Sequence, residues 1–158
     1  MNGKLVGGAI VLTGAVAGLA MYWLQVHAFY EPVAADAPQA RMQLTLLATG
    51  EPEPIVVEAF EGIDADSSPL RFRACFTTPM SLAHMTETYE IYEGAEPLIA
   101  PPWFDCFDAA RIGPDVADGP AVAFLSQREI APGVDRVIAV YPDGRAFAWH
   151  QLNDSAED

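Results

Sequence analysis

The stretch "VDRVIAVYPDGRAFAWHQ", residues 134–151, decides the fold of this chain. Two runs rich in apolar residues flank Pro142-Asp143-Gly144, and a short turn sequence between two such runs predicts a β-hairpin. Strand side chains point alternately to two faces, so Phe147 and Trp149 are expected on one face and His150 on the other. The hairpin predicts an antiparallel sheet.

Strand signals continue upstream of the hairpin. Residues 70–76 alternate most clearly, with one face formed by Leu70, Phe72, Ala74 and Phe76 and the other by Arg71, Arg73 and Cys75. Further strands are expected at 42–46, 55–60, 88–92 and 120–126, a loop at 61–69, and helices at 81–87 and 105–112, the second ended by Gly113-Pro114. The division between 81–87 and 88–92 stays open, because positions 82, 85, 89 and 92 also fit one face of a longer helix. This pattern favours an α+β domain with an antiparallel sheet and two or three short helices.

The N-terminal part has a different character. Residues 5–24, LVGGAIVLTGAVAGLAMYWL, carry no charge and are long enough to cross about 30 Å of hydrocarbon as a helix. Lys4 is the only charged residue before Glu31, so the positive-inside tendency places the N-terminus in the cytoplasm and the rest outside a bacterial inner membrane. We expect a cytoplasmic N-terminus at 1–4, a transmembrane helix at 5–27, a linker at 28–40, a periplasmic α+β domain at 41–152 and a polar tail at 153–158.

Aromatic residues gather at the far end of this span. They are typical of an interfacial belt at the level of the lipid headgroups, and they are Tyr22, Trp23, Phe29 and Tyr30. A cleaved signal peptide is the competing interpretation, but its apolar region would be shorter, about 7–15 residues. Residues 35–37, Ala-Asp-Ala, resemble a cleavage site, but proline follows them. The sequence favours an uncleaved anchor.

Three glycines mark one face of the span. Gly14 and Gly18 form a GxxxG pattern, and Gly7 lies one heptad before Gly14. Small residues let helices approach closely in lipid, so this face is a candidate packing surface. Glycine is also common in such spans without a packing role, and both interpretations stay open. The expected partners are the lipid bilayer and other membrane helices within a larger complex.

Charge is concentrated beyond the span. All 22 acidic residues lie at or after Glu31, together with seven arginines, which leaves a formal charge of −15 for this part. Such a domain repels phosphate backbones, so no nucleic-acid partner is expected. Its charge suits basic partners.

The two cysteines, Cys75 and Cys106, both lie among aromatic residues. An even number of cysteines in an oxidising outer compartment favours a disulfide. The bridge would close a loop of about 30 residues, which loop entropy makes worth roughly 3–4 kcal/mol. We expect it to tie the segment Trp103–Phe107 across the face of the sheet that carries Cys75.

A copper site is the alternative use of this region. Soft metals accept the ligands offered here, which are Cys75, Met80, His84 and Met85, with Cys106 brought near. Such a set would suit a copper metallochaperone or a thiol-based assembly factor. Against it, a disulfide would remove both thiolates, and Met85 fits a core helix face, where methionine is a common gap filler. We expect no metal and no cofactor.

No catalytic motif is present in the sequence. It contains no GxSxG, no glycine-rich phosphate loop, no HExxH and no CxxC pattern. We therefore expect a protein that is not an enzyme, although an enzyme of unrecognised type is the third possibility.

Four stretches carry a resemblance: FYEP after the span, RFRACF, PPWFDCFDA and GVDRVIAVYPDGRAFAWHQLN. They resemble a family of uncharacterised alphaproteobacterial proteins with one N-terminal span and a small outer domain. The resemblance covers nearly the whole chain and implies this architecture, but no activity, substrate or catalytic residue. Together with an acidic domain that has no catalytic motif, the resemblance favours a membrane-anchored interaction module. Such a module would be an accessory subunit or assembly factor of an envelope complex such as a respiratory one.

Overall fold

The predicted hairpin forms two inner strands of a six-stranded sheet in the structure, a computed structural model that describes residues 2–157. Strands β7 (Val134–Val140) and β8 (Arg145–Leu152) pair antiparallel, with Val140 opposite Ala146. In the turn, Gly144 has a φ of +88°, and an added Cβ would come within 2.6 Å of the Thr78 carbonyl oxygen. Only glycine fits this position.

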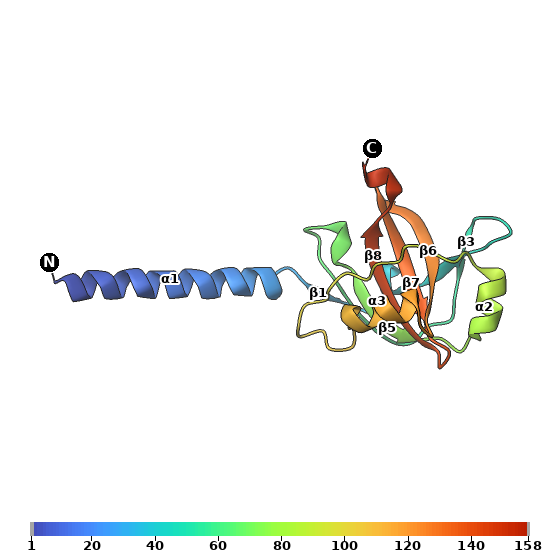
Figure 1. Cartoon of the computed structure of the whole chain (residues 1–158), viewed down its shortest axis with the longest axis horizontal. Coiled ribbons are helices and arrows are strands. Elements are labelled where there is room, and N and C mark those ends of the chain that lie inside the picture. Colours follow the sequence, from blue (N-terminus) through green and yellow to red (C-terminus); the bar gives the residue numbers. More distant parts are fainter. Residues whose placement is uncertain (1, 158) are drawn as a thin grey trace. The chain divides into compact units, whose positions relative to one another are not determined.

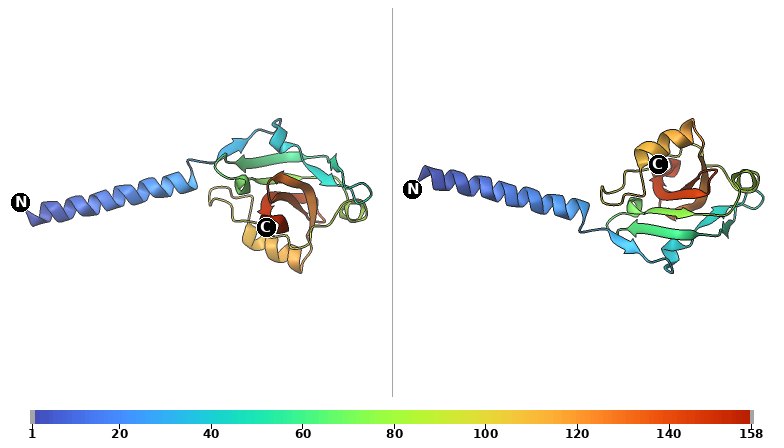
Figure 2. Two further views of the ribbon diagram at one scale, coloured as in Figure 1. Left: turned by 90° about the horizontal axis from the view of Figure 1, so that it is seen from above. Right: turned by 90° about the horizontal axis from the view of Figure 1, so that it is seen from below.

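Every strand pair in the large sheet is antiparallel, and the strand order is β1-β4-β5-β8-β7-β6. Its other members are β1 (Glu31–Val33), β4 (Glu58–Asp64), β5 (Arg73–Thr77) and β6 (Val122–Ala131). A separate pair joins β2 (Gln43–Thr45) and β3 (Pro52–Pro54). Figure 1 shows this arrangement, and Figure 2 shows the curvature of the large sheet.

Helices are few outside the N-terminal part. The α-helices are α1 (Gly3–Val26), α2 (Leu82–Thr88) and α3 (Ala109–Ala117), and single 3-10 turns occur at η1 (Pro38–Ala40), η2 (Pro69–Arg71) and η3 (Asp154–Glu157). The chain forms two compact units, Met1–Tyr30 and Glu31–Asp158. The predicted α+β class, with an antiparallel sheet and short helices, is confirmed.

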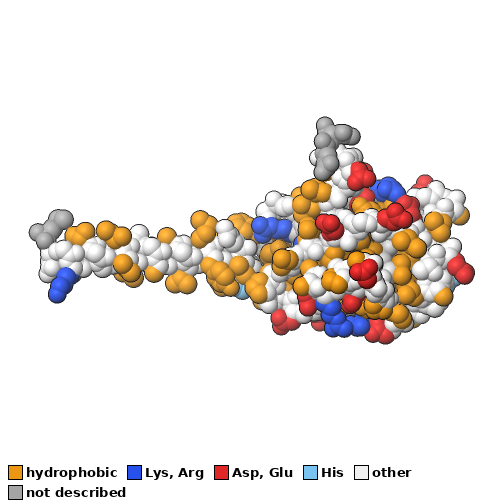
Figure 3. Space-filling model, in the orientation of Figure 1, with side chains coloured by type: hydrophobic (Ala, Val, Ile, Leu, Met, Phe, Trp, Pro, Cys, Tyr) orange, Lys and Arg blue, Asp and Glu red, His pale blue; other side chains and the backbone are white. Residues whose placement is uncertain are grey.

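Helix α1 makes up nearly all of the first unit. It is 24 residues long and has no buried residue. Its length and composition suffice to cross a membrane, a property that it shares with signal sequences, and within residues 2–157 it is the one helix that has this property. Figure 3 shows hydrophobic side chains along α1, whereas the acidic side chains lie on the second unit.

Side chains pack on both faces of the large sheet. On one face, Phe72 and Phe76 join the core that β2 and α2 cover with Met42, Leu44 and Met85. On the opposite face, segment 104–107 and α3 cover the sheet, and the Phe107 ring lies edge-on to Phe147 and Trp149, with centroid distances of 6.1 and 6.3 Å. The predicted separation of Phe147 and Trp149 from His150 is confirmed, because His150 stacks on Phe72.

The expected linker over 28–40 is shorter in the structure. Residues 31–33 form the edge strand β1, whose residue Pro32 lies opposite Ile63, and Ala40 is buried. An edge strand tolerates proline because one side of it has no partner strand. The expected polar tail likewise contributes to the fold, since the Asn153 amide donates to the Gly133 carbonyl oxygen. Met1 and Asp158, the ends of the expected cytoplasmic segment and of the tail, lie outside the described residues.

Several boundaries differ from the prediction; for example, the strand expected at 70–76 begins only at Arg73, after the 3-10 turn η2, and the one expected at 120–126 is β6 at 122–131. The strand expected at 55–60, with a loop at 61–69, is instead β4 at 58–64, and it contains a bulge at which Ala59 has a φ of +50°. The strand expected at 88–92 pairs only through isolated bridges, Leu46 to Tyr89 and Ile91 to Phe124. Helix α3 continues through Pro114, because the Asp108 cap at its start and buried Ile112 hold it.

Candidate interaction surface

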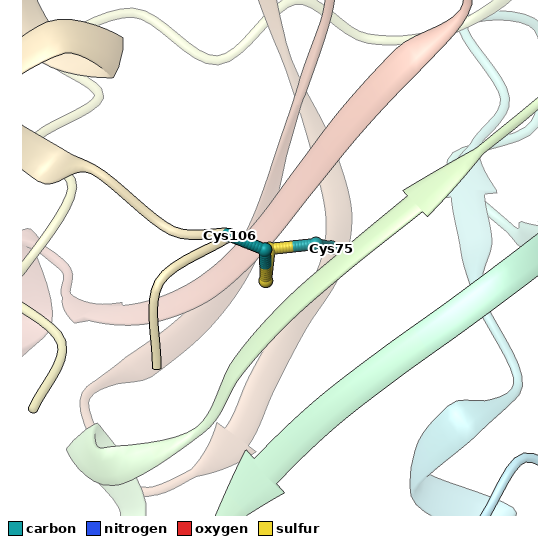
Figure 4. The surroundings of a disulfide bond; sticks show 2 residues. All are labelled: Cys75 and Cys106. Atoms are coloured by element: carbon teal, nitrogen blue, oxygen red, sulfur yellow. A yellow bond between two sulfur atoms is a disulfide. The ribbon is translucent and has the colours of Figure 1, made fainter. Parts of the chain in front are cut away.

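The structure joins Cys75 and Cys106 in a disulfide, with a Cα–Cα distance of 6.3 Å (Figure 4). Cys75 lies in β5 opposite Phe147 of β8, and Cys106 lies in the segment that carries Phe104 and Phe107. The bridge therefore ties this segment to the face that the sequence predicted.

The alternative copper ligands are not brought together. Cys75 lies on one face of β5, while its neighbours Ala74 and Phe76 point into the core on the other. Met85 is fully buried in the core that contains Ala74 and Phe76, and Met80 packs against this core. His84 is exposed on α2. The set is thus divided between the two faces of the sheet.

The glycines and aromatic residues of the first unit have open surroundings within it. A Cβ added at Gly7, Gly14 or Gly18 would meet no atom of the described residues within 4 Å. Tyr22 and Trp23 are more than half exposed. The packing role of the glycines and the interfacial role of Tyr22, Trp23, Phe29 and Tyr30 remain predictions.

A buried histidine and arginine form a cluster that the sequence did not indicate. His150 of β8 is 3 % exposed, and its Nε2 accepts a hydrogen bond of 2.9 Å from the Arg136 Nε. Its Nδ1 lies 2.6 Å from the Pro69 carbonyl oxygen, so the neutral ring carries its proton on Nδ1. Burial, and then the charge of Arg136, lower the pKa of His150 to about 3. Both ring nitrogens are used, and the cluster is structural.

Asp135 of β7 is a second buried polar group. It is 1 % exposed and accepts hydrogen bonds from the Tyr92 hydroxyl at 3.2 Å, the Glu129 amide at 3.0 Å and the Asn153 side chain at 2.8 Å. Burial, and then the charge of Asp135, raise the pKa of Tyr92 to about 12. These bonds join the segment around Tyr92 to the C-terminal part of β6 and to the C-terminal region.

The segment 90–97 runs along the outer edge of β6. The Tyr92 amide donates to the Ala123 carbonyl oxygen, and the Glu90 carbonyl oxygen accepts from the Leu125 amide. Gln151 of β8 fixes the next turn of the segment, because its side chain donates to the Gly94 carbonyl oxygen and accepts from the Glu96 amide. The segment is therefore held at several points along its length.

An apolar hollow of about 720 Å³ lies between this segment and α3. Ile91 and Pro97 form part of one wall, and Gly113 and Val116 of α3 form part of the other. Small side chains in α3 and in or just before β6 leave the space open, namely Ala109, Ala117, Ala121 and Ala123.

An acidic hollow of about 890 Å³ lies next to the apolar hollow and shares with it five lining residues of the segment 91–96. Its charged lining consists of one arginine, Arg128, and six acidic residues, Glu90, Glu93, Glu96, Glu129, Asp135 and Asp154. Arg128 is paired with Glu90. Glu93, Glu96 and Glu129 are exposed, so their charges face solvent.

The surface formed by the two hollows has features suited to binding another molecule rather than to chemistry. Among residues 2–157, no three histidine, cysteine, aspartate or glutamate side chains are placed to hold a metal ion. The side chains of buried Asp135 and His150 are hydrogen-bonded to neighbouring residues of the fold. The two adjoining hollows offer a partner an apolar recess beside a negatively charged one.

Comparisons with known proteins place the chain in a family. Neither a curated protein nor a solved structure matches it. One family model matches residues 42–158, which include β2 to β8, the disulfide and both hollows. The chain therefore belongs to the family of unknown function DUF6446.

Proposed function

We propose that this protein is a membrane-anchored interaction module, an accessory subunit or assembly factor of an envelope complex such as a respiratory one. Helix α1 is retained as the anchor, with the N-terminus in the cytoplasm and the second unit in the periplasm. Lys4 before the span and the acidic residues after it support this orientation. The role is not enzymatic.

The acidic hollow is the observation that carries the proposal. Six acidic residues against one arginine make it attractive to a basic segment of a partner, and the field of the whole domain adds to the attraction. The Gln151 contacts hold its wall in place before binding. A wall that is already ordered lowers the entropy cost of association.

Charge reversal at the hollow tests the proposal. Glu93→Lys combined with Glu96→Lys inverts two exposed charges in its lining. The matched control, Glu58→Lys with Glu87→Lys, changes the net charge equally at exposed sites that line neither hollow. Membranes are extracted in mild detergent, and the mass and stoichiometry of the native complex are measured.

We expect the wild type and the control to keep a partner at fixed stoichiometry and the hollow variant to lose it. Retention of the same partner by the hollow variant would show that the acidic hollow is not the binding surface.

A further inference from the structure

Residues 97–103, PLIAPPW, form a loop that presents apolar side chains to solvent. Ile99 is 83 % exposed, the highest value among the exposed large hydrophobic side chains of residues 2–157, and Trp103 is 37 % exposed. No charged residue occurs between Glu96 and Asp105, in a domain with 22 acidic residues. This loop is therefore the part of the domain best suited to contact an apolar environment.

The fold holds the loop in this position. Arg73, which is 3 % exposed, donates from Nε to the Leu98 carbonyl oxygen at 2.8 Å and from a terminal nitrogen to the Ile99 carbonyl oxygen at 3.3 Å. Just beyond the loop, Phe104 is buried and Cys106 is bridged to β5. The backbone of Ile99 is fixed, so its exposure belongs to the folded state.

The loop lies at the end of the domain where the chain enters it. Pro32 of β1 is opposite Ile63 of β4, and Ile63 is opposite Arg73 of β5, so Arg73 is two strands, about 10 Å, from Pro32. The Arg73 side chain then reaches the backbone of Ile99. Figures 1 and 2 show this loop and β1 at the same end of the domain.

The tether to that end is short. Five steps along the chain join Val26, the last residue of α1, to Glu31 of β1, and they span at most about 18 Å. An anchored α1 therefore keeps this end of the domain within reach of the headgroup region, which is several ångströms thick. Tryptophan is enriched in that region, since its ring is apolar and its N–H is polar.

We propose that the loop 97–103 is a second membrane contact, with Ile99 and Trp103 inserted among the lipids of the bilayer that holds α1. This inference rests on the proposed anchoring of α1. Two contacts, a span and a loop, would limit rotation of the domain and give the acidic hollow a fixed direction relative to the membrane.

Lipid quenching of tryptophan in the full chain tests this contact. The protein is reconstituted in phosphatidylcholine vesicles with acyl chains brominated near the headgroup. Ile99→Trp is made in a background with Trp23→Phe and Trp103→Phe, where buried Trp149 remains as a constant reference. The control is Leu47→Trp in the same background; Leu47 is 57 % exposed.

Leu47 is a suitable control because its amide bonds to Thr88 at the end of α2, and α2 and β1 lie at opposite ends of the domain (Figure 1). We expect the tryptophan at position 99 to be quenched as strongly as Trp23 is in a Trp103→Phe chain, and the one at position 47 to be unquenched. Quenching of Trp23 without quenching at position 99 would overturn the inference. No quenching of Trp23 would refute the anchor, and the inference with it.

A second measurement covers the case in which Ile99→Trp disturbs the loop. The single variant Trp23→Phe keeps the natural Trp103 beside buried Trp149. Quenching of the exposed component supports the contact, and a spectrum unchanged by brominated lipid contradicts it.

Discussion

His150 links the stability of the fold to pH. Its pKa is about 3 in the folded state against 6.5 as the ordinary value, because burial and the charge of Arg136 oppose protonation, while the bond to the Pro69 carbonyl oxygen partly favours it. Between these values the unfolded chain binds a proton that the folded chain does not. The contribution of His150 to the free energy of unfolding therefore falls as pH falls from about 6.5 towards 3.

Replacement of His150 should remove this pH dependence. His150→Gln keeps an acceptor for Arg136 and a donor for Pro69 but does not titrate. Below about pH 6 the free energy of unfolding of the wild type should drop by about 1.4 kcal/mol per pH unit more than that of the variant. Urea unfolding between about pH 7 and about pH 4 measures this difference.

The matched control is His84→Gln, at an exposed position on α2. It should keep the steep dependence of the wild type. Parallel curves for the wild type and His150→Gln would show that His150 is protonated equally in both states.

The face on which His150 lies could be predicted from the sequence, but its partners could not. Alternation along residues 145–151 is a local signal. Its contacts with Arg136 and Pro69 cross 14 and 81 positions of the chain, and only the pairing of β7 with β8 and the course of η2 bring them together. The same holds for the hydrogen bonds that Gln151 makes with Gly94 and Glu96 in the segment 90–97.

At the scale of elements, the disulfide should stabilise the fold without defining it. Its ends are separated by 31 positions, and loop entropy gives about 3–4 kcal/mol for such a closure. The packing of Phe107 on Phe147 and Trp149 involves neither cysteine, so it should persist without the bridge. Cys75→Ala combined with Cys106→Ala should therefore fold, but with a free energy of unfolding lower by about this amount.

Chemical denaturation measures the loss, and near-ultraviolet circular dichroism checks that Trp149 keeps its environment. An unchanged free energy of unfolding would mean that the bridge is not a structural staple.

The hairpin of β7 and β8 was predictable because both its signals, turn and alternation, are local. The position of β4 was not, since the bulge at Ala59 interrupts the alternation and Ile63 is buried after it. Strand β1 has three residues and contains Pro32, so the sequence gives almost no signal for a strand there or for its pairing with β4. Both hollows depend on where segment 90–97 lies beside β6, which is likewise a non-local fact.

At the scale of the whole molecule, the glycine face of α1 offers a test of partner binding. Gly14→Ile with Gly18→Ile should release a membrane partner, because the added side chains block close helix approach. Within residues 2–157 an added Cβ at either position meets no atom within 4 Å, so we expect the substitutions to act at a contact with another molecule. The control, Ala9→Ile with Ala20→Ile, enlarges the opposite side of the helix.

Size-exclusion chromatography with light scattering in mild detergent measures the mass of the complex. A mass equal to that of the wild type in the glycine variant would show that this face meets only lipid.

Both proposals require that α1 stays attached to the domain. If the apolar helix stays in the membrane, it holds the domain at the membrane surface. The domain's formal charge of −15 then acts on other proteins at that surface. A helix removed as a signal sequence would instead release the domain, and neither the loop 97–103 nor the glycine face would meet the membrane.

The intact mass of the protein in carbonate-washed membranes tests this most directly. Carbonate removes proteins that are not embedded, and the mass shows whether the first thirty residues are present. We expect a species of 17.0 kDa in the membrane pellet. A shorter species that lacks α1 and is found in the wash would contradict it.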